Sequence, residues 1–150
     1  MSKFKLLNLQ VISVKLKATS FDQNSTEDIK TKSFAVKCLS SDPEDKQFGI
    51  QFNIELESGD KDFNLSVIAI AHFDTDEPIT KEFLSSDFIR INAPAIGYPY
   101  LRSFISNLTL NSGYNPVILP TFNFVAMEAN RKKRLSTQKE KLEKARLLKE

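Results

Sequence analysis

The chain has 150 residues, of which 41% are hydrophobic and 27% charged, and its formal net charge is +2. These values fit one globular domain that can bury a core, and no apolar run reaches the ~18 residues of a spanning helix. The N-terminal segment lacks the apolar stretch of a signal peptide, and the single cysteine, Cys38, excludes an internal disulfide. We therefore expect a cytoplasmic protein that does not insert into membranes.

The net charge hides an asymmetry along the chain. Residues 131–150 contain nine Lys or Arg and three Glu, which gives +6, whereas residues 1–130 contain twelve basic and sixteen acidic residues, which gives −4. The two parts therefore need separate interpretations.

The first two expected strands alternate apolar and polar residues. Residues 4–18 change phase along their length, which predicts either a long strand with bulges or a strand with both faces partly covered. Residues 22–31 are polar and indicate a loop. Phe34, Val36 and Cys38 then alternate again, which predicts a short second strand that ends near Ser40.

The clearest local pattern is a long hairpin. Alternation over residues 48–56 is followed by Ser58-Gly59-Asp60, and it resumes over residues 63–73. This predicts two antiparallel strands with one strongly apolar face, joined at Gly59, where glycine allows a positive φ. Ile68 and Ile70 fall on the opposite face, so we expect that face to be partly covered.

Helical patterns occupy the C-terminal half. Residues 78–91 are ambiguous, with apolar residues at helix-like spacing, and residues 92–100 lead into a helix that Gly113 is placed to end. After an extended linker at 116–120, a second helix is expected from Thr121 or Phe122. The order indicates one α+β domain over residues 1–128, followed by a basic, helical tail over residues 129–150.

The sequence offers little that resembles an enzyme. The only histidine, His72, lies in a strand pattern, which is typical of a surface or structural residue, and the four glycines are too dispersed for a phosphate-binding loop. Asp74 and Asp76 lack the remaining ligands of a calcium loop. We expect no catalytic residue, no metal and no cofactor.

Aromatic content is the more informative property. The chain has twelve Phe and three Tyr but no Trp. A four-stranded sheet covered by two helices cannot hide all of these rings, and an exposed apolar surface needs a second protomer or a client.

Two segments carry a resemblance to a known family. Residues 98–109 (YPYLRSFISNLT) and residues 113–124 (GYNPVILPTFNF) resemble the SecB export-chaperone family, and the match is collinear over residues 3–128. The resemblance implies a four-stranded antiparallel sheet with two C-terminal helices and a homotetramer built as a dimer of dimers. It also implies ATP-independent binding of unfolded client polypeptides in grooves lined by aromatic side chains.

The resemblance also implies roles for particular residues. The expected client-binding residues are Phe48, Phe52, Tyr98, Phe104 and Phe124, with Phe34 and Phe63 as further candidates. The expected oligomer interface consists of Tyr100, Leu101, Phe104, Ile105 and Leu108.

The client and the motor partner stay open. Family members that work with the SecA motor present acidic residues where this chain has Ser13, Lys17 and Val67, which weakens the expectation that SecA docks here. The family also includes chaperones of toxin–antitoxin systems. An antitoxin and secretory preproteins are therefore both candidate clients.

An alternative function is a nucleic-acid- or ribosome-binding adaptor. In that hypothesis, residues 131–134 (RKKR) and the lysines that follow contact phosphates. A solvated helix face, with Glu140 and Glu143 pairing with nearby lysines, explains the same run without a nucleic acid.

Overall fold

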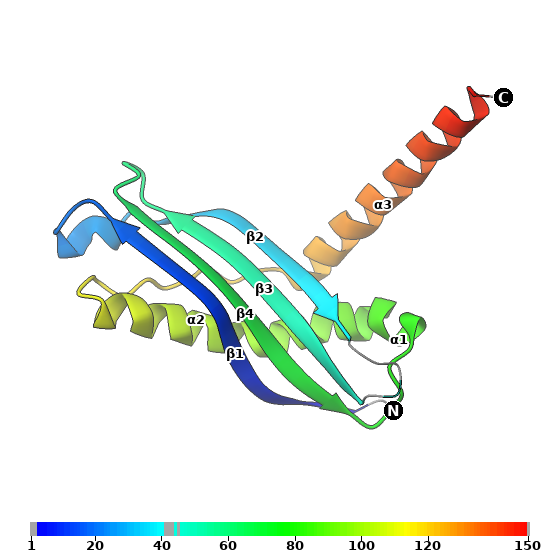
Figure 1. The fold of residues 1–150 in the computed structure, drawn as a ribbon, viewed down its shortest axis with the longest axis horizontal. Helices are drawn as coiled ribbons and strands as arrows, with labels where there is room; N and C mark the ends of the chain where they lie inside the picture. Colours follow the sequence, from blue (N-terminus) through cyan, green and yellow to red (C-terminus); the bar gives the residue numbers. More distant parts are fainter. Residues whose placement is uncertain (1–2, 41–43, 45, 150) are drawn as a thin grey trace.

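Four strands form a single antiparallel sheet (Figure 1), which confirms the predicted fold class. The structure, a computed structural model, describes residues 3–40, 44 and 46–149. The sheet order is β1-β4-β3-β2, so β1 and β2 occupy the two edges. The strands are β1 (Phe4–Ala18), β2 (Lys30–Leu39), β3 (Gln47–Glu57) and β4 (Phe63–Thr75), and a short 3₁₀ helix, η1 (Gln23–Thr26), lies between the first two.

Bulges explain the phase changes of β1. Its register against β4 shifts between Leu6 and Asn8 and again between Val11 and Ser13. Each shift inserts one extra residue, Leu7 or Ile12, and both are exposed. Of the two interpretations of this strand, the bulged one is confirmed.

The turn between β3 and β4 differs from the sequence-based expectation. The residue with positive φ is Lys61 (φ 64°), not Gly59. Gly59 makes a contact instead: its N–H donates to Asp28 Oδ2 at 3.0 Å, and a Cβ at this position would require the Asp28 side chain to shift. The contact partner lies 31 residues earlier in the chain, so the local pattern did not reveal it.

The ambiguous segment before the main helix is largely helical. It contains α1 (Lys81–Ser85) and a π-helical turn, η2 (Phe88–Asn92), which leads directly into α2 (Ala93–Asn111). Gly113, at φ 93°, follows the end of α2 as expected. Pro94 lies in the first turn, but Pro99 lies inside the helix, where it removes one backbone hydrogen bond on the exposed side.

The core lies between the sheet and α2. Alternate residues of β3 and β4 are buried, and they meet Leu101 and Ile105 of the helix, both fully buried. Gly97 permits the close approach, because a Cβ there would lie 2.9 Å from the Cβ of Ala71 and 3.2 Å from Cε2 of Phe52. One face of the sheet is therefore covered, and the other is free of helices (Figure 1).

The last helix, α3 (Phe124–Leu147), begins slightly later than predicted. Asn123 caps it, with its Oδ1 accepting a hydrogen bond from Ala126 N at 3.0 Å. The first turns pack on the body, and beyond Arg131 all described residues of the chain are exposed. Figure 1 shows this part of α3 as an arm that projects away from the sheet.

Candidate functional site

The structure divides the expected client-binding residues into separate groups. Phe52, Tyr98 and Phe124 are buried in one aromatic cluster, with ring centroids 6.4 Å apart for Phe52–Tyr98 and 5.7 Å for Tyr98–Phe124. Phe48 is buried elsewhere, stacked on Phe73 at 5.1 Å. Phe104, on α2, is half-buried and belongs to neither cluster, and Phe63 is buried beside Tyr114.

Two rings form the accessible side of the first cluster. Phe34 and Phe122 stack at 4.2 Å, and both are half-buried. Phe34 was a secondary candidate from the sequence, whereas Phe122 was not identified as a site residue. The alternation of Phe122 and Phe124 around the cap residue Asn123 is the signal that could have indicated it.

A groove runs along β2 beside this cluster. Phe34, Val36 and Cys38 project from the covered face of the edge strand, and Phe124 and Met127 of α3 lie opposite. The enclosed part of the groove measures about 170 Å³. Among the described strands β2 pairs only with β3, so its other side presents backbone groups without a strand partner next to the groove.

Charged side chains also line the groove. They are the arginines Arg90, Arg131 and Arg134 and, among the described residues, one carboxylate, Glu128. Glu128 is only 6% exposed and accepts two hydrogen bonds from Arg131, at 2.8 and 2.7 Å. These hydrogen bonds raise the pKa of the Arg131 guanidinium.

The environment of the Cys38 thiol is both buried and close to arginine charges. Burial raises its pKa, and the charges of Arg90 and Arg131 oppose that shift. A desolvated thiol at a raised pKa stays protonated and behaves as an apolar side chain. Cys38 therefore contributes apolar surface to the groove.

The expected interface residues on α2 point in two directions. Leu101 and Ile105 are fully buried against the sheet, whereas Tyr100 is 55% exposed and Phe104 and Leu108 are half-buried. The part of this set that a second protomer could reach is therefore Tyr100, Phe104 and Leu108. One protomer does not test the interface, which stays a prediction.

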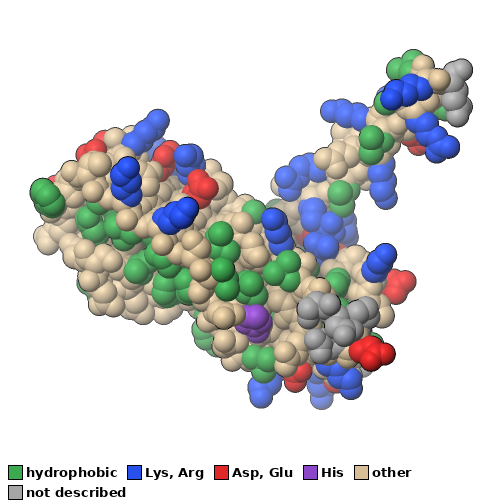
Figure 2. Space-filling model, viewed as in Figure 1, with side chains coloured by type: hydrophobic (Ala, Val, Ile, Leu, Met, Phe, Trp, Pro, Cys, Tyr) green, Lys and Arg blue, Asp and Glu red, His purple; other side chains and the backbone are tan. Residues whose placement is uncertain are grey.

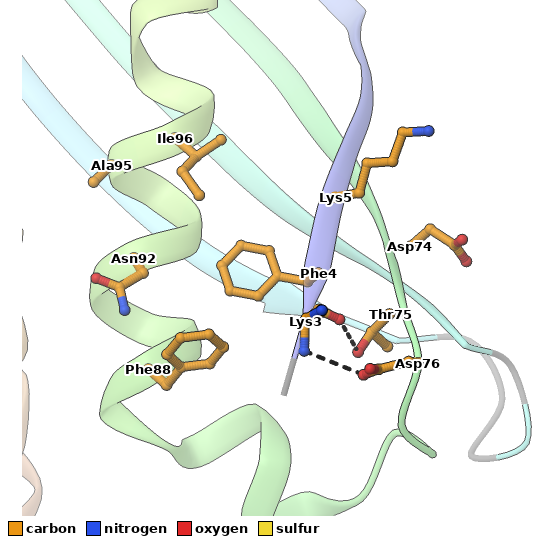
Figure 3. A pocket seen from close by; sticks show the side chains of 10 residues that line it. All are labelled: Lys3, Phe4, Lys5, Asp74, Thr75, Asp76, Phe88, Asn92, Ala95 and Ile96. Carbon is orange, nitrogen blue, oxygen red and sulfur yellow. Dashed lines mark hydrogen bonds between the residues drawn. The ribbon is translucent and has the colours of Figure 1, made fainter. Parts of the chain in front are cut away.

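A larger hollow of about 810 Å³ lies beside the start of β1 (Figure 3). The rings of Phe4 and Phe88 line it, 5.0 Å apart, and Ile96 of α2 points toward them. At its rim, Lys3 N–H donates to Asp76 Oδ1 at 3.2 Å. The hollow thus joins the free edge of β1 to the exposed side of α2.

Apolar side chains gather at the centre of the uncovered sheet face (Figure 2). They come from Leu39 of β2 and from Ile68 and Ile70 of β4. Of the three positions where SecA-binding relatives are acidic, Ser13 and Lys17 lie on this face, but Val67 is buried on the other. Val67 therefore cannot contribute to docking on the open face.

The described residues that line the groove are mainly apolar side chains and arginines. Within the described residues no group of three or more His, Cys, Asp or Glu could hold a metal ion. His72 lies on the open sheet face, with Nε2 2.9 Å from Gln10 Oε1. No helix in the described ranges is long and apolar enough to cross a membrane. Aromatic and aliphatic side chains beside an open strand edge are typical of surfaces that bind extended polypeptide segments.

Comparison with known proteins identifies the family. The family model described as "Preprotein translocase subunit SecB" matches residues 5–135, so the chain belongs to the SecB family, a family of chaperones. The SecB protein-export protein of Magnetococcus marinus is 25% identical over 126 residues, covering 78% of this chain and 80% of that protein. An uncharacterised protein of Methanocaldococcus jannaschii is 49% identical over 43 residues, which span 29% of this chain and 28% of the relative.

Solved structures share the fold. The SecB-like chaperone Rv1957 of Mycobacterium tuberculosis, in complex with a ChAD peptide from the Rv1956 HigA1 antitoxin, matches with a TM-score of 0.62 at 16% identity. The match covers 79% of this chain and 89% of that one. A protein of unknown function from Streptococcus agalactiae matches with a TM-score of 0.53 at 13% identity, covering 81% and 99% of the two chains.

Proposed function

We propose that the protein is an ATP-independent cytoplasmic chaperone that holds unfolded client polypeptides in the groove along β2. The observation that carries this proposal is the position of the Phe34–Phe122 pair beside a sheet edge on which no described strand pairs. An extended client can bury apolar side chains there, at about 25 cal/mol per Å², and add main-chain hydrogen bonds to the free edge. Neither contribution requires a folded client.

Two client classes follow from the relatives. The M. tuberculosis chaperone of the same fold was solved with an antitoxin peptide, and the M. marinus relative is a protein-export protein. An antitoxin and secretory preproteins are therefore the two clients we propose. Purification of the protein with its bound clients from its own host, followed by mass spectrometry, separates them: one dominant partner supports the antitoxin, and many precursors support export.

The direct test is suppression of aggregation without ATP. The wild-type protein should keep a chemically denatured reporter in solution, and Met127→Lys, which places a charge in the groove, should weaken this effect. The matched control is Val125→Lys, because Val125 lies on the same helix, is 60% exposed and does not line the groove. No suppression by the wild-type protein at a molar excess would refute the proposal.

We further propose that the protein acts as a homo-oligomer, a tetramer built as a dimer of dimers. Residues 93–111 of α2 include a single charged residue, Arg102, although the side away from the sheet is exposed. Ile96 is 43% exposed, Tyr100 55% and Leu110 54%. An uncharged exposed helix face of this kind is typical of a surface that a second protomer covers.

The boundary at residue 128 between the chaperone domain and its tail stays a prediction.

Nucleic-acid binding is the competing hypothesis, and one observation favours it. The part of α3 beyond residue 130 projects from the body and carries basic side chains along its length (Figure 2). Steeply salt-dependent binding to RNA or DNA, lost on removal of residues 131–150, would support this function. Equal binding by both forms of the protein, or none, would exclude it.

A further inference from the structure

The groove along β2 carries a positive charge that apolar binding alone does not need. Three guanidinium groups line it, and Glu128 is the one carboxylate among the lining residues that the structure describes. That carboxylate is fully used, because both of its oxygens accept hydrogen bonds from Arg131. Among the described lining residues, an excess of two positive charges therefore remains, from Arg90 and Arg134.

Arg90 is the more informative of these two residues. Its Nε is buried and has no hydrogen-bond partner among the described residues. Asp87, on the turn before η2, is engaged instead by Lys132, with Nζ 2.6 Å from Oδ1. A buried guanidinium N–H without an acceptor is unfavourable, and the positive charge of Arg90 is not paired with any described carboxylate there, so a carboxylate placed beside this side chain in the groove is favourable.

The arginines and the aromatic pair lie at different points along β2. Arg90 and Arg131 are close enough to Cys38 to affect its pKa. Phe34, which stacks on Phe122, lies four residues earlier on the same strand and faces the same side. At the usual rise of a strand, this separation is about 13 Å, which an extended ligand spans with about four residues.

We propose that this groove selects unfolded segments in which an Asp or Glu lies about four residues from an apolar, aromatic-containing stretch. The inference rests on the proposed chaperone function and specifies its clients. The apolar stretch covers Phe34 and Phe122, while the carboxylate reaches Arg90 and Arg134. Guanidinium groups pair with carboxylates through two parallel hydrogen bonds, and they repel a Lys or Arg of the client at the same position.

The experiment uses three fluorescein-labelled peptides with one aromatic–aliphatic sequence and Asp, Asn or Lys at the flanking position. Fluorescence anisotropy with the full-length protein should give a dissociation constant about tenfold lower for the Asp peptide than for the Asn peptide, with the Lys peptide weakest. The preference should decrease as salt is raised.

Two variants test whether Arg134 and Arg90 produce the preference for the Asp peptide. Arg134→Gln, at an exposed position, and Arg90→Gln should each bring the Asp and Asn peptides closer together in affinity. The control is Arg146→Gln, which removes the same charge from the distal end of α3, outside the groove. It should leave the preference unchanged.

The outcomes separate this inference from the function on which it rests. Equal affinities for the three peptides, or a preference that Arg146→Gln removes as much as Arg134→Gln does, would overturn the acidic preference and leave the chaperone function standing. Failure of all three peptides to bind, together with no suppression of aggregation, would overturn both.

Discussion

At the scale of single residues, Tyr98 connects the helix to the linker that precedes α3. Its hydroxyl donates a hydrogen bond to the carbonyl oxygen of Pro120, and its ring packs between Phe34, Phe122 and Phe124. Tyr98 thus supports the groove from beneath rather than lining its open side. We expect Tyr98→Phe to lower the free energy of unfolding by about 1 kcal/mol, because Pro120 then loses its donor. Urea denaturation measures this change.

The same residue predicts a pH dependence. Burial raises the pKa of Tyr98 from 10.0 to about 12. Below pH 10 Tyr98 keeps its proton in both the folded and the unfolded chain, so its full contribution to the free energy of unfolding is present. Between pH 10 and about 12 the unfolded chain loses the proton first, and the free energy of unfolding falls as pH rises. The stability difference between wild type and Tyr98→Phe should therefore shrink over this range, and a constant difference would contradict it.

The residue scale also marks a limit of sequence-based prediction. Of the five rings expected to bind clients, Phe52, Tyr98 and Phe124 gather in one cluster, whereas Phe48 and Phe104 lie elsewhere. Sequence alone does not show which ring faces solvent, because exposure depends on neighbours from distant segments. Phe52, on β3, is fully buried because Phe34 of β2 and Tyr98 of α2 pack on it, whereas Phe34, on the edge strand, keeps one side accessible.

At the scale of elements, the contact between α2 and the sheet depends on Gly97. A Cβ at this position would lie 2.9 Å from the Cβ of Ala71, which is fixed to the strand backbone and cannot move aside. We expect Gly97→Ala to lower the free energy of unfolding by about 1–3 kcal/mol, despite the better helix propensity of alanine. The Ala71→Gly change should restore part of the loss in a double-mutant cycle, and strictly additive effects would contradict this explanation.

Elements were predictable where their signals are local. Strict alternation correctly predicted strands β3 and β4. The phase changes predicted the bulges of β1, and Gly113 predicted the end of α2. Predictions failed where the decisive partner is distant, as for Gly59 and Asp28. The start of α3 was misplaced because the Asn123 cap, rather than the apolar residues before it, determines where the helix begins.

The arm of α3 adds helix without adding stability. From residue 135 onward its described side chains are exposed. We expect truncation after Arg134 to reduce the helical circular-dichroism signal while changing the free energy of unfolding by less than about 0.5 kcal/mol. The contrast is Glu128→Ala, which leaves Arg131 without its carboxylate and should cost about 1–3 kcal/mol. A large loss on truncation would show that the arm packs on the body or on another protomer.

At the scale of the whole molecule, one protomer leaves two apolar surfaces with different characters. The groove along β2 is narrow and bordered by arginines, whereas the exposed side of α2 is wide, nearly free of charge and continuous with the hollow at Phe4 and Phe88. A surface that must release its ligand is typically small and bordered by polar groups. A surface that holds a permanent partner is typically larger and more hydrophobic. This difference is the physical reason for proposing α2 as the interface and β2 as the client site.

Self-association through α2 predicts a dependence of stability on concentration. Because assembly stabilises only the folded state, the thermal midpoint should rise as protein concentration rises. Tyr100→Glu introduces a charge at the centre of the exposed face of α2, so sedimentation should detect smaller species and the concentration dependence should weaken. Phe104 is half-buried, so a change there would also perturb the protomer and is not used. The control is Ile12→Glu, which adds the same charge at an exposed bulge of β1, outside α2. If Tyr100→Glu sediments like the wild type, α2 is not the interface, and its uncharged side must serve another ligand.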